Sequence, residues 1–191
     1  MVIPQFGAAT LKLMKPALFL LAALPVAALA QLVPDSFSVP REFRGDSYRL
    51  VPLGPDVAKL DYEAYMSSID HIRASTGGNW PRPGLTMDDQ AKDMAGEQAQ
   101  WDQRKSFPFA VLSLDGSKEY GCFYIRPSRK EGYDAVATMW VIKEQFDQGF
   151  EPKLYQDMKA WLIKSWPFRK VAWPGREIPQ EQWKALPNRR P

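Results

Sequence analysis

The fold of this chain is decided by residues 139–163, which read MWVIKEQFDQGFEPKLYQDMKAWLI. The stretch begins as an apolar strand, passes through a polar segment that contains Gly149, and continues with apolar residues at helical spacing. Those residues are Leu154, Met158, Trp161 and Leu162. The junction of a strand and a following helix often holds a phosphate, because free N–H groups and the helix dipole favour an anion there. The stretch therefore predicts an α/β protein with a candidate anion site.

The segments around this stretch predict a mixed sheet. Strands are expected at 48–53, 107–114, 120–127, 134–142 and 170–173, and helices at 55–74, 86–105, 154–162 and 179–186. The letters DGSK at 115–118 indicate a hairpin turn. A hairpin and a crossover helix cannot both occur in a purely parallel sheet. The predicted order is therefore β-α-α-β-β-β-α-β, followed by a short C-terminal helix.

The first thirty residues have the pattern of a secretory signal. Two lysines precede an apolar run at 16–27, and the small-x-small sequence ALA follows at 28–30. We expect cleavage between Ala30 and Gln31, and a periplasmic or secreted protein. The run is shorter than the roughly 20 residues that span a bilayer, so no stable membrane anchor is expected. Met14 is an alternative start that leaves a shorter signal; an uncleaved anchor and a mis-assigned start codon are the alternatives to export.

The mature chain is expected to consist of an extended arm at 31–47 and a single domain at 48–191. Pro34, Pro40 and Gly45 interrupt the arm, which shows no periodicity. Two of the 25 basic residues are the signal lysines, and the rest nearly balance the 22 acidic residues, so nucleic acid is not an expected partner.

Cysteine and histidine are too scarce for the usual metal or redox motifs. Cys122 is the only cysteine, which excludes an internal disulfide and a CxxC site. His71 is the only histidine, and a Cys-His pair would need a proximity that nothing in the sequence indicates. Cys122 is therefore expected to be a small buried hydrophobic residue, and no metal is expected.

Five segments in a characteristic order resemble a known family. They are FPFAVLSLDGS, GCFYIRPS, AVATMWV, WLIKSWPF and VAWPGRE. Over 48–177 the chain resembles a bacterial branch of the GNAT superfamily, the Gcn5-related N-acetyltransferases. The resemblance implies a GNAT-like mixed central sheet and an acyl-CoA-dependent N-acyltransferase. Its donor would be acetyl-CoA or another acyl-CoA, and its acceptor a small-molecule or peptide amine.

The resemblance also implies where the donor binds. In the family, the strand matching 134–142 splays from the strand matching 170–173, and pantetheine pairs with the exposed backbone between them. The pyrophosphate lies on the following loop, which in the family reads Gln/Arg-x-x-Gly-x-Gly/Ala. Here Glu151 stands where a small residue belongs, and Pro152 lacks an N–H donor. The expected cofactor-binding residues are Trp140, Val141, Ile142, Lys143, Gln148, Gly149 and Lys153, with weak affinity for CoA.

The residues expected to perform chemistry are few. Many family members carry a general-acid Tyr after the last strand, but no Tyr follows Trp173 in this chain. Asp134, at the start of a central strand, is the candidate base, the alternative being a solvated acid at a strand end. Trp80 and Tyr124 are assigned to the acceptor side, although packing is the alternative for Trp80. No metal ligand is assigned.

Two hypotheses about function remain open. The first is the acyltransferase that the family resemblance implies. The second is an exported, non-catalytic GNAT-like binding module for a small molecule or a protein partner. The altered loop and the missing Tyr favour the second. The signal pattern favours it as well, because acetyl-CoA is a cytoplasmic metabolite. The acceptor and the oligomeric state do not follow from the sequence.

Overall fold

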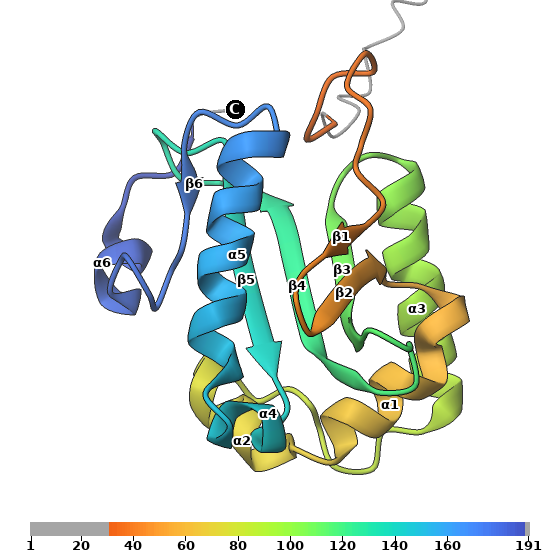
Figure 1. Cartoon of the computed structure of the whole chain (residues 1–191). Helices are drawn as coiled ribbons and strands as arrows, with labels where there is room; N and C mark the ends of the chain where they lie inside the picture. Colours follow the sequence, from red (N-terminus) through yellow and green to blue (C-terminus); the bar gives the residue numbers. More distant parts are fainter. Residues whose placement is uncertain (1–30, 190–191) are drawn as a thin grey trace, which may run out of the picture.

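A six-stranded sheet with its strands in sequence order forms the centre of the structure, a computed structural model that describes residues 31–189 (Figure 1). The strands are β1 (Phe43–Arg44), β2 (Tyr48–Pro52), β3 (Phe107–Ser113), β4 (Glu119–Pro127), β5 (Ala135–Val141) and β6 (Val171–Ala172). Neighbours from β1 to β5 are antiparallel, whereas β5 and β6 are parallel. The predicted mixed α/β sheet is confirmed. The arm predicted at 31–47 differs in one respect, because it contains the short edge strand β1.

Helices fill the two long connections of the sheet. Between β2 and β3 lie the 3-10 turn η1 (Pro55–Val57) and the helices α1 (Ala58–Met66), α2 (Ile69–Thr76) and α3 (Met87–Asp102). Between β5 and β6 lie α4 (Lys143–Asp147) and α5 (Phe150–Ser165), and α6 (Gln180–Ala185) follows β6. The short C-terminal helix is thus present as predicted. Among residues 31–189, no helix combines the length and the apolar character needed to cross a membrane.

Two helical predictions need correction. The single helix expected at 55–74 is interrupted at Ser67 and Ser68. The Ser67 hydroxyl donates to the Ala64 carbonyl at 2.7 Å, and the Ser68 hydroxyl accepts the backbone N–H of Lys143 at 2.9 Å. Serine side chains that bond to backbone groups compete with the helical ladder, which accounts for the break. The loop expected after Ile142 is instead the short helix α4.

Alternating side chains of the central strands enter two separate cores. Phe109, Phe123 and Met139 lie in the core that α5 covers, where Leu154 and Met158 are fully buried. Ala110, Cys122 and Trp140 lie in the second core, under α1, α2 and α3. Figure 1 shows α5 lying along β5 and β4. The helical stripe predicted for 154–162 is therefore confirmed as the face that packs on the sheet.

Candidate functional site

An open edge of β5 is the first feature of the candidate site. β5 pairs with β4 along its whole length, but with β6 only at Ala135 and Val136. Within residues 31–189, the edge of β5 from Ala137 to Val141 therefore has no strand partner. Such an edge presents unpaired backbone N–H and C=O groups, which can bond to an extended ligand.

A cleft of about 1100 Å³ borders this open edge. It lies on the side of the sheet covered by α1 and α3, and its floor includes Thr138, Met139 and Trp140 of β5. The loop before α3 adds Trp80, and β4 adds Tyr124 and Arg126. The helical wall includes Asp61, Gln90, Asp93, Met94, Glu97 and Gln100, together with Lys92. A cleft of this size can hold a ligand of drug or cofactor dimensions.

Aromatic rings form one end of the cleft. The Trp80 ring lies 5.9 Å from that of Trp140 and 5.1 Å from that of Tyr65. The indole N–H of Trp140 donates to the Tyr124 hydroxyl at 3.4 Å. Trp80 is 36% exposed, whereas Trp140 is almost fully buried. The structure thus brings together Trp80 and Tyr124, predicted for the acceptor, and Trp140, predicted for the donor.

A carboxylate and a guanidinium form the polar part of the cleft. Glu97 of α3 lies 3.7 Å from Arg126 of β4, and Arg126 also lies over the Tyr124 ring at 4.1 Å from its centre. Burial raises the pKa of Glu97, and Arg126 only partly opposes that shift. A carboxylate with a raised pKa is suited to accept a proton near neutral pH. Glu97 was not predicted as a site residue, because a glutamate in a charged helix carries no recognisable signal.

The predicted pyrophosphate loop has a different form. α4 begins directly after Ile142, Gln148 ends it, and Gly149 precedes α5 with a φ of 74°. That positive φ explains the glycine, because other residues adopt it at a cost. Val141 and Ile142 are buried in the two cores, and the N–H of Ile142 already donates to the Tyr120 carbonyl at 2.9 Å.

The cations predicted for the pyrophosphate are paired with carboxylates. Lys143 binds Asp147 at 2.5 Å, and Lys153 lies 3.2 Å from Asp46 and 2.9 Å from Asp157. Glu151, in the first turn of α5, forms an ion pair with Arg176. An anion at this helix start would therefore compete with neighbouring carboxylates for each of these cations. Their assignment to a cofactor remains a prediction.

Asp134 has a clear structural partner. Its carboxylate accepts the backbone N–H groups of Arg169 at 2.7 Å and Lys170 at 3.0 Å. These bonds hold the chain before β6 against the start of β5. Asp134 is not among the residues that line the cleft. The catalytic role predicted for it has no contact in the described residues to support it, and the function proposed below does not use it.

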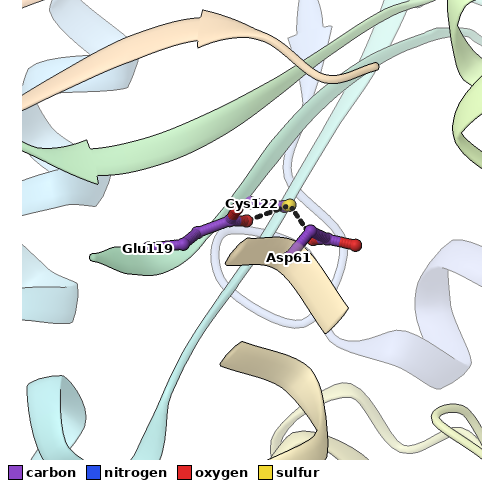
Figure 2. Close-up of side chains that lie close together, drawn as sticks. All are labelled: Asp61, Glu119 and Cys122. Carbon is purple, nitrogen blue, oxygen red and sulfur yellow. Dashed lines mark hydrogen bonds between the residues drawn. The ribbon is translucent and has the colours of Figure 1, made fainter. Parts of the chain in front are cut away.

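A buried cluster behind the cleft wall was not predicted. Asp61 of α1 approaches Glu119 and Cys122 of β4, as Figure 2 shows. The Cys122 thiol donates to Asp61 Oδ1 at 3.2 Å or to Glu119 Oε1 at 3.1 Å. Burial raises the pKa of both carboxyl groups and of the thiol. The expectation that Cys122 is buried is confirmed, but its neighbours are polar.

Comparisons with protein-family models and with curated proteins find no match. Solved structures do match. A ribosomal-protein-S5-alanine acetyltransferase from Vibrio fischeri has a TM-score of 0.55 at 12% identity, over 69% of this chain and 72% of that one. An acetyltransferase from Salmonella typhimurium, described as modifying the N-terminal serine of ribosomal protein L7/L12, has a TM-score of 0.53 at 9% identity, over 68% and 71% of the two chains.

The chain has a GNAT-like fold. Identities this low show the fold alone.

Proposed function

We propose that this protein is an acyl-CoA-dependent N-acyltransferase that uses acetyl-CoA or another acyl-CoA and a small-molecule or peptide amine. The open edge of β5 at 137–141 is the observation that carries the proposal, because it borders the large cleft. An extended pantetheine arm has amide groups that can pair with such an edge. The names of the structural neighbours, which are acetyltransferases, support the same class of reaction.

The residues of the cleft can share the work of acyl transfer. The donor supplies the acyl thioester. Glu97 is placed to take the proton that an acceptor amine loses, since burial raises its pKa toward the working range. Tyr124 stays protonated at neutral pH because burial raises its pKa well above the ordinary value, so its hydroxyl can donate a hydrogen bond to developing negative charge. Trp80 and Trp140 offer apolar surface to the substrate.

A second candidate is a non-catalytic GNAT-like binding module. The ion pair between Glu151 and Arg176 favours it, because this pair occupies the start of α5 where a pyrophosphate would lie. We also propose export with cleavage between Ala30 and Gln31, although that pattern lies outside the described residues. A periplasmic or secreted protein would have no access to acetyl-CoA, which is a cytoplasmic metabolite. Fractionation of a full-length protein tagged at its C-terminus therefore separates the two candidates.

The enzyme proposal is tested by thiol release. Purified protein is incubated with acetyl-CoA and a panel of amines, including peptides with free N-termini, while free CoA is detected with a thiol reagent and products by mass spectrometry. Trp80→Ala should raise KM for the amine, whereas Trp183→Ala on α6, outside the cleft, is the matched control. Glu97→Gln should lower kcat, and the loss should shrink as the pH falls and wild-type Glu97 itself becomes protonated. No amine-dependent thiol release at any donor concentration would contradict the proposal.

A further inference from the structure

A β-bulge places two polar residues of β4 on the same face. In a regular strand, residues three apart such as Glu119 and Cys122 point to opposite faces. Here Val111 of β3 is opposite Gly121, and Leu112 is opposite Glu119, so Tyr120 is left without a partner. Bulges of this kind redirect side chains and often occur next to functional sites. As a result, Glu119 and Cys122 both face α1 and approach Asp61.

A glycine makes this bulge possible. Gly121 has a φ of 152°, and a Cβ on it would lie 2.0 Å from the carbonyl oxygen of Trp140. Only a residue without a side chain allows β5 to approach so closely. The arrangement of the cluster is therefore fixed by close packing of backbone against backbone.

The cluster lacks a positive partner. Asp61 and Glu119 are each 2% exposed, and no ion pair joins either of them to a Lys, Arg or His among residues 31–189. Glu119 Oε2 is buried and has no hydrogen-bond partner. Figure 2 shows the Glu119 carboxylate directed toward the thiol and Asp61. Buried carboxylates are costly unless a cation, a metal or a proton neutralises them.

We propose that Asp61, Glu119 and Cys122 bind one divalent transition-metal ion of the zinc type. Their ligand atoms all lie within 4.8 Å of one another. A thiolate combined with two carboxylates suits Zn²⁺, which binds sulfur and oxygen ligands, better than Mg²⁺ or Ca²⁺, which prefer oxygen alone. Water or another small ligand would complete four-coordination, since three protein ligands leave one position open.

The two sulfur–oxygen distances require only a small adjustment. With Zn–S of about 2.3 Å and Zn–O of about 2.1 Å, a tetrahedral site separates sulfur and oxygen by about 3.6 Å. The present separations are 3.2 Å to Asp61 and 3.1 Å to Glu119, so the ligands must part by about 0.4–0.5 Å. The thiol hydrogen bonds that now draw them together are lost when the metal replaces the thiol proton.

A supporting residue and two bordering cavities complete the site. Gln90 of α3 donates to Asp61 Oδ2 at 2.8 Å and to the Ala58 carbonyl at 3.1 Å, which holds the other carboxylate oxygen toward the thiol. Such bonds orient metal ligands and affect metal affinity. Asp61 lines the large cleft, while Glu119 lines a separate cavity of about 330 Å³. A bound ion would join α1 to β4 at the wall of the cleft.

The test uses the full mature chain, stripped with a chelator and loaded with zinc or cobalt chloride. We expect one equivalent of tightly held zinc by elemental analysis, together with a rise in melting temperature. The cobalt form should show an ultraviolet thiolate-to-metal charge-transfer band and the intense visible bands of a tetrahedral site. Cys122→Ser should remove the charge-transfer band, and Gln90→Ala should weaken zinc binding about 10- to 100-fold. Asp102→Asn, an exposed acid of α3 outside both the cluster and the cleft, is the matched control and should leave both readouts unchanged.

Several results would overturn the proposal. Stripped wild-type protein that takes up no stoichiometric zinc and shows no cobalt band would show that the two acids are neutralised by protons instead. If Cys122→Ser binds zinc with unchanged affinity, the zinc is an adventitious ion only. Should a variant fail to fold, the cobalt spectrum of the wild-type chain still decides the question. None of these readouts depends on acyl transfer, so the proposed function can fail without affecting this result.

Discussion

The ion pair between Glu151 and Arg176 leads to the sharpest prediction about the donor site. In the first turn of α5, Glu151 places a negative charge where a pyrophosphate would lie, and Pro152 withholds an N–H. Glu151 also holds the Arg176 guanidinium in an ion pair, so this cation is not free to bind a phosphate. The double change Glu151→Gly with Pro152→Ala should free Arg176, remove the like charge and restore one donor.

The expected gain follows from the bonds that become available. A hydrogen bond to a charged group contributes about 1.5–3 kcal/mol. Because about 1.4 kcal/mol corresponds to a tenfold change in affinity, one new bond of this kind tightens CoA binding about ten- to a hundredfold. The loss of a partly exposed ion pair and the glycine in the helix should cost about 1 kcal/mol of stability, which binding measurements at low temperature tolerate.

Calorimetric titration with CoA measures the effect. Wild-type protein should show weak or undetectable binding below millimolar CoA, and the double variant should bind measurably. Glu181→Gly is the matched control, because it removes a first-turn acid from α6, where it pairs with Lys184. Micromolar binding by the wild type would refute the view that this loop is impaired. If the double variant and the control bind equally weakly, the start of α5 is not the phosphate site.

The other predictions concern stability, pH and processing. Trp161→Ala should cost about 3–5 kcal/mol in urea denaturation, since the ring is buried against Phe109 and Trp166; a loss under about 1 kcal/mol would show that it is not a core residue. Gly121→Ala should cost about 1–3 kcal/mol more than Gly132→Ala, because an added Cβ lies 2.0 Å from the Trp140 carbonyl oxygen at Gly121 and has no atom within 4 Å at Gly132, although φ is positive at both, 152° and 79°; equal losses would show that the bulge is not tightly packed. Because burial raises the pKa of Glu97, the folded state binds its proton more tightly than the unfolded state, and wild type should lose stability relative to Glu97→Gln as the pH rises above 4.5, the ordinary pKa of a glutamate; a constant difference would contradict that shift. N-terminal sequencing of native protein should give Gln31, and residues before Ala28 on soluble cytoplasmic protein would contradict export.

Most elements of this fold could be predicted because they have local signals. The stripe of Leu154 and Met158 identifies α5, and alternating residues on β4 and β5 identify a sheet with two covered faces. Thr86 begins α3 with a capping box, in which its hydroxyl accepts the N–H of Asp89 at 3.2 Å. These patterns depend only on neighbours in the sequence, so they are visible without the structure.

The features that differ from prediction depend on distant contacts. Ser68 interrupts the first helix partly because its hydroxyl receives the N–H of Lys143, which lies 75 residues away. The cluster of Asp61 with Glu119 and Cys122 requires the bulge at Tyr120. The bulge turns Glu119 to the opposite face of the sheet from the one it would have in a regular strand. Neither contact leaves a periodic trace in the sequence. Glu97 also could not be predicted from its neighbours in the sequence, because its ion-pair partner Arg126 lies on a different element.

The bulge also connects the two proposed sites. Beyond Gly121, β4 continues regularly, so Cys122 and Tyr124 point to the same face of the sheet, and Tyr124 lines the cleft. Asp61 belongs to both sites, because it lines the cleft and approaches the thiol. A metal ion that fixes Asp61 would thereby fix α1 as the wall against which an acceptor binds. This effect would serve an acyltransferase and a non-catalytic module equally. The difference between the two functions therefore lies at the edge of β5 and the start of α5, where the donor either binds or is excluded.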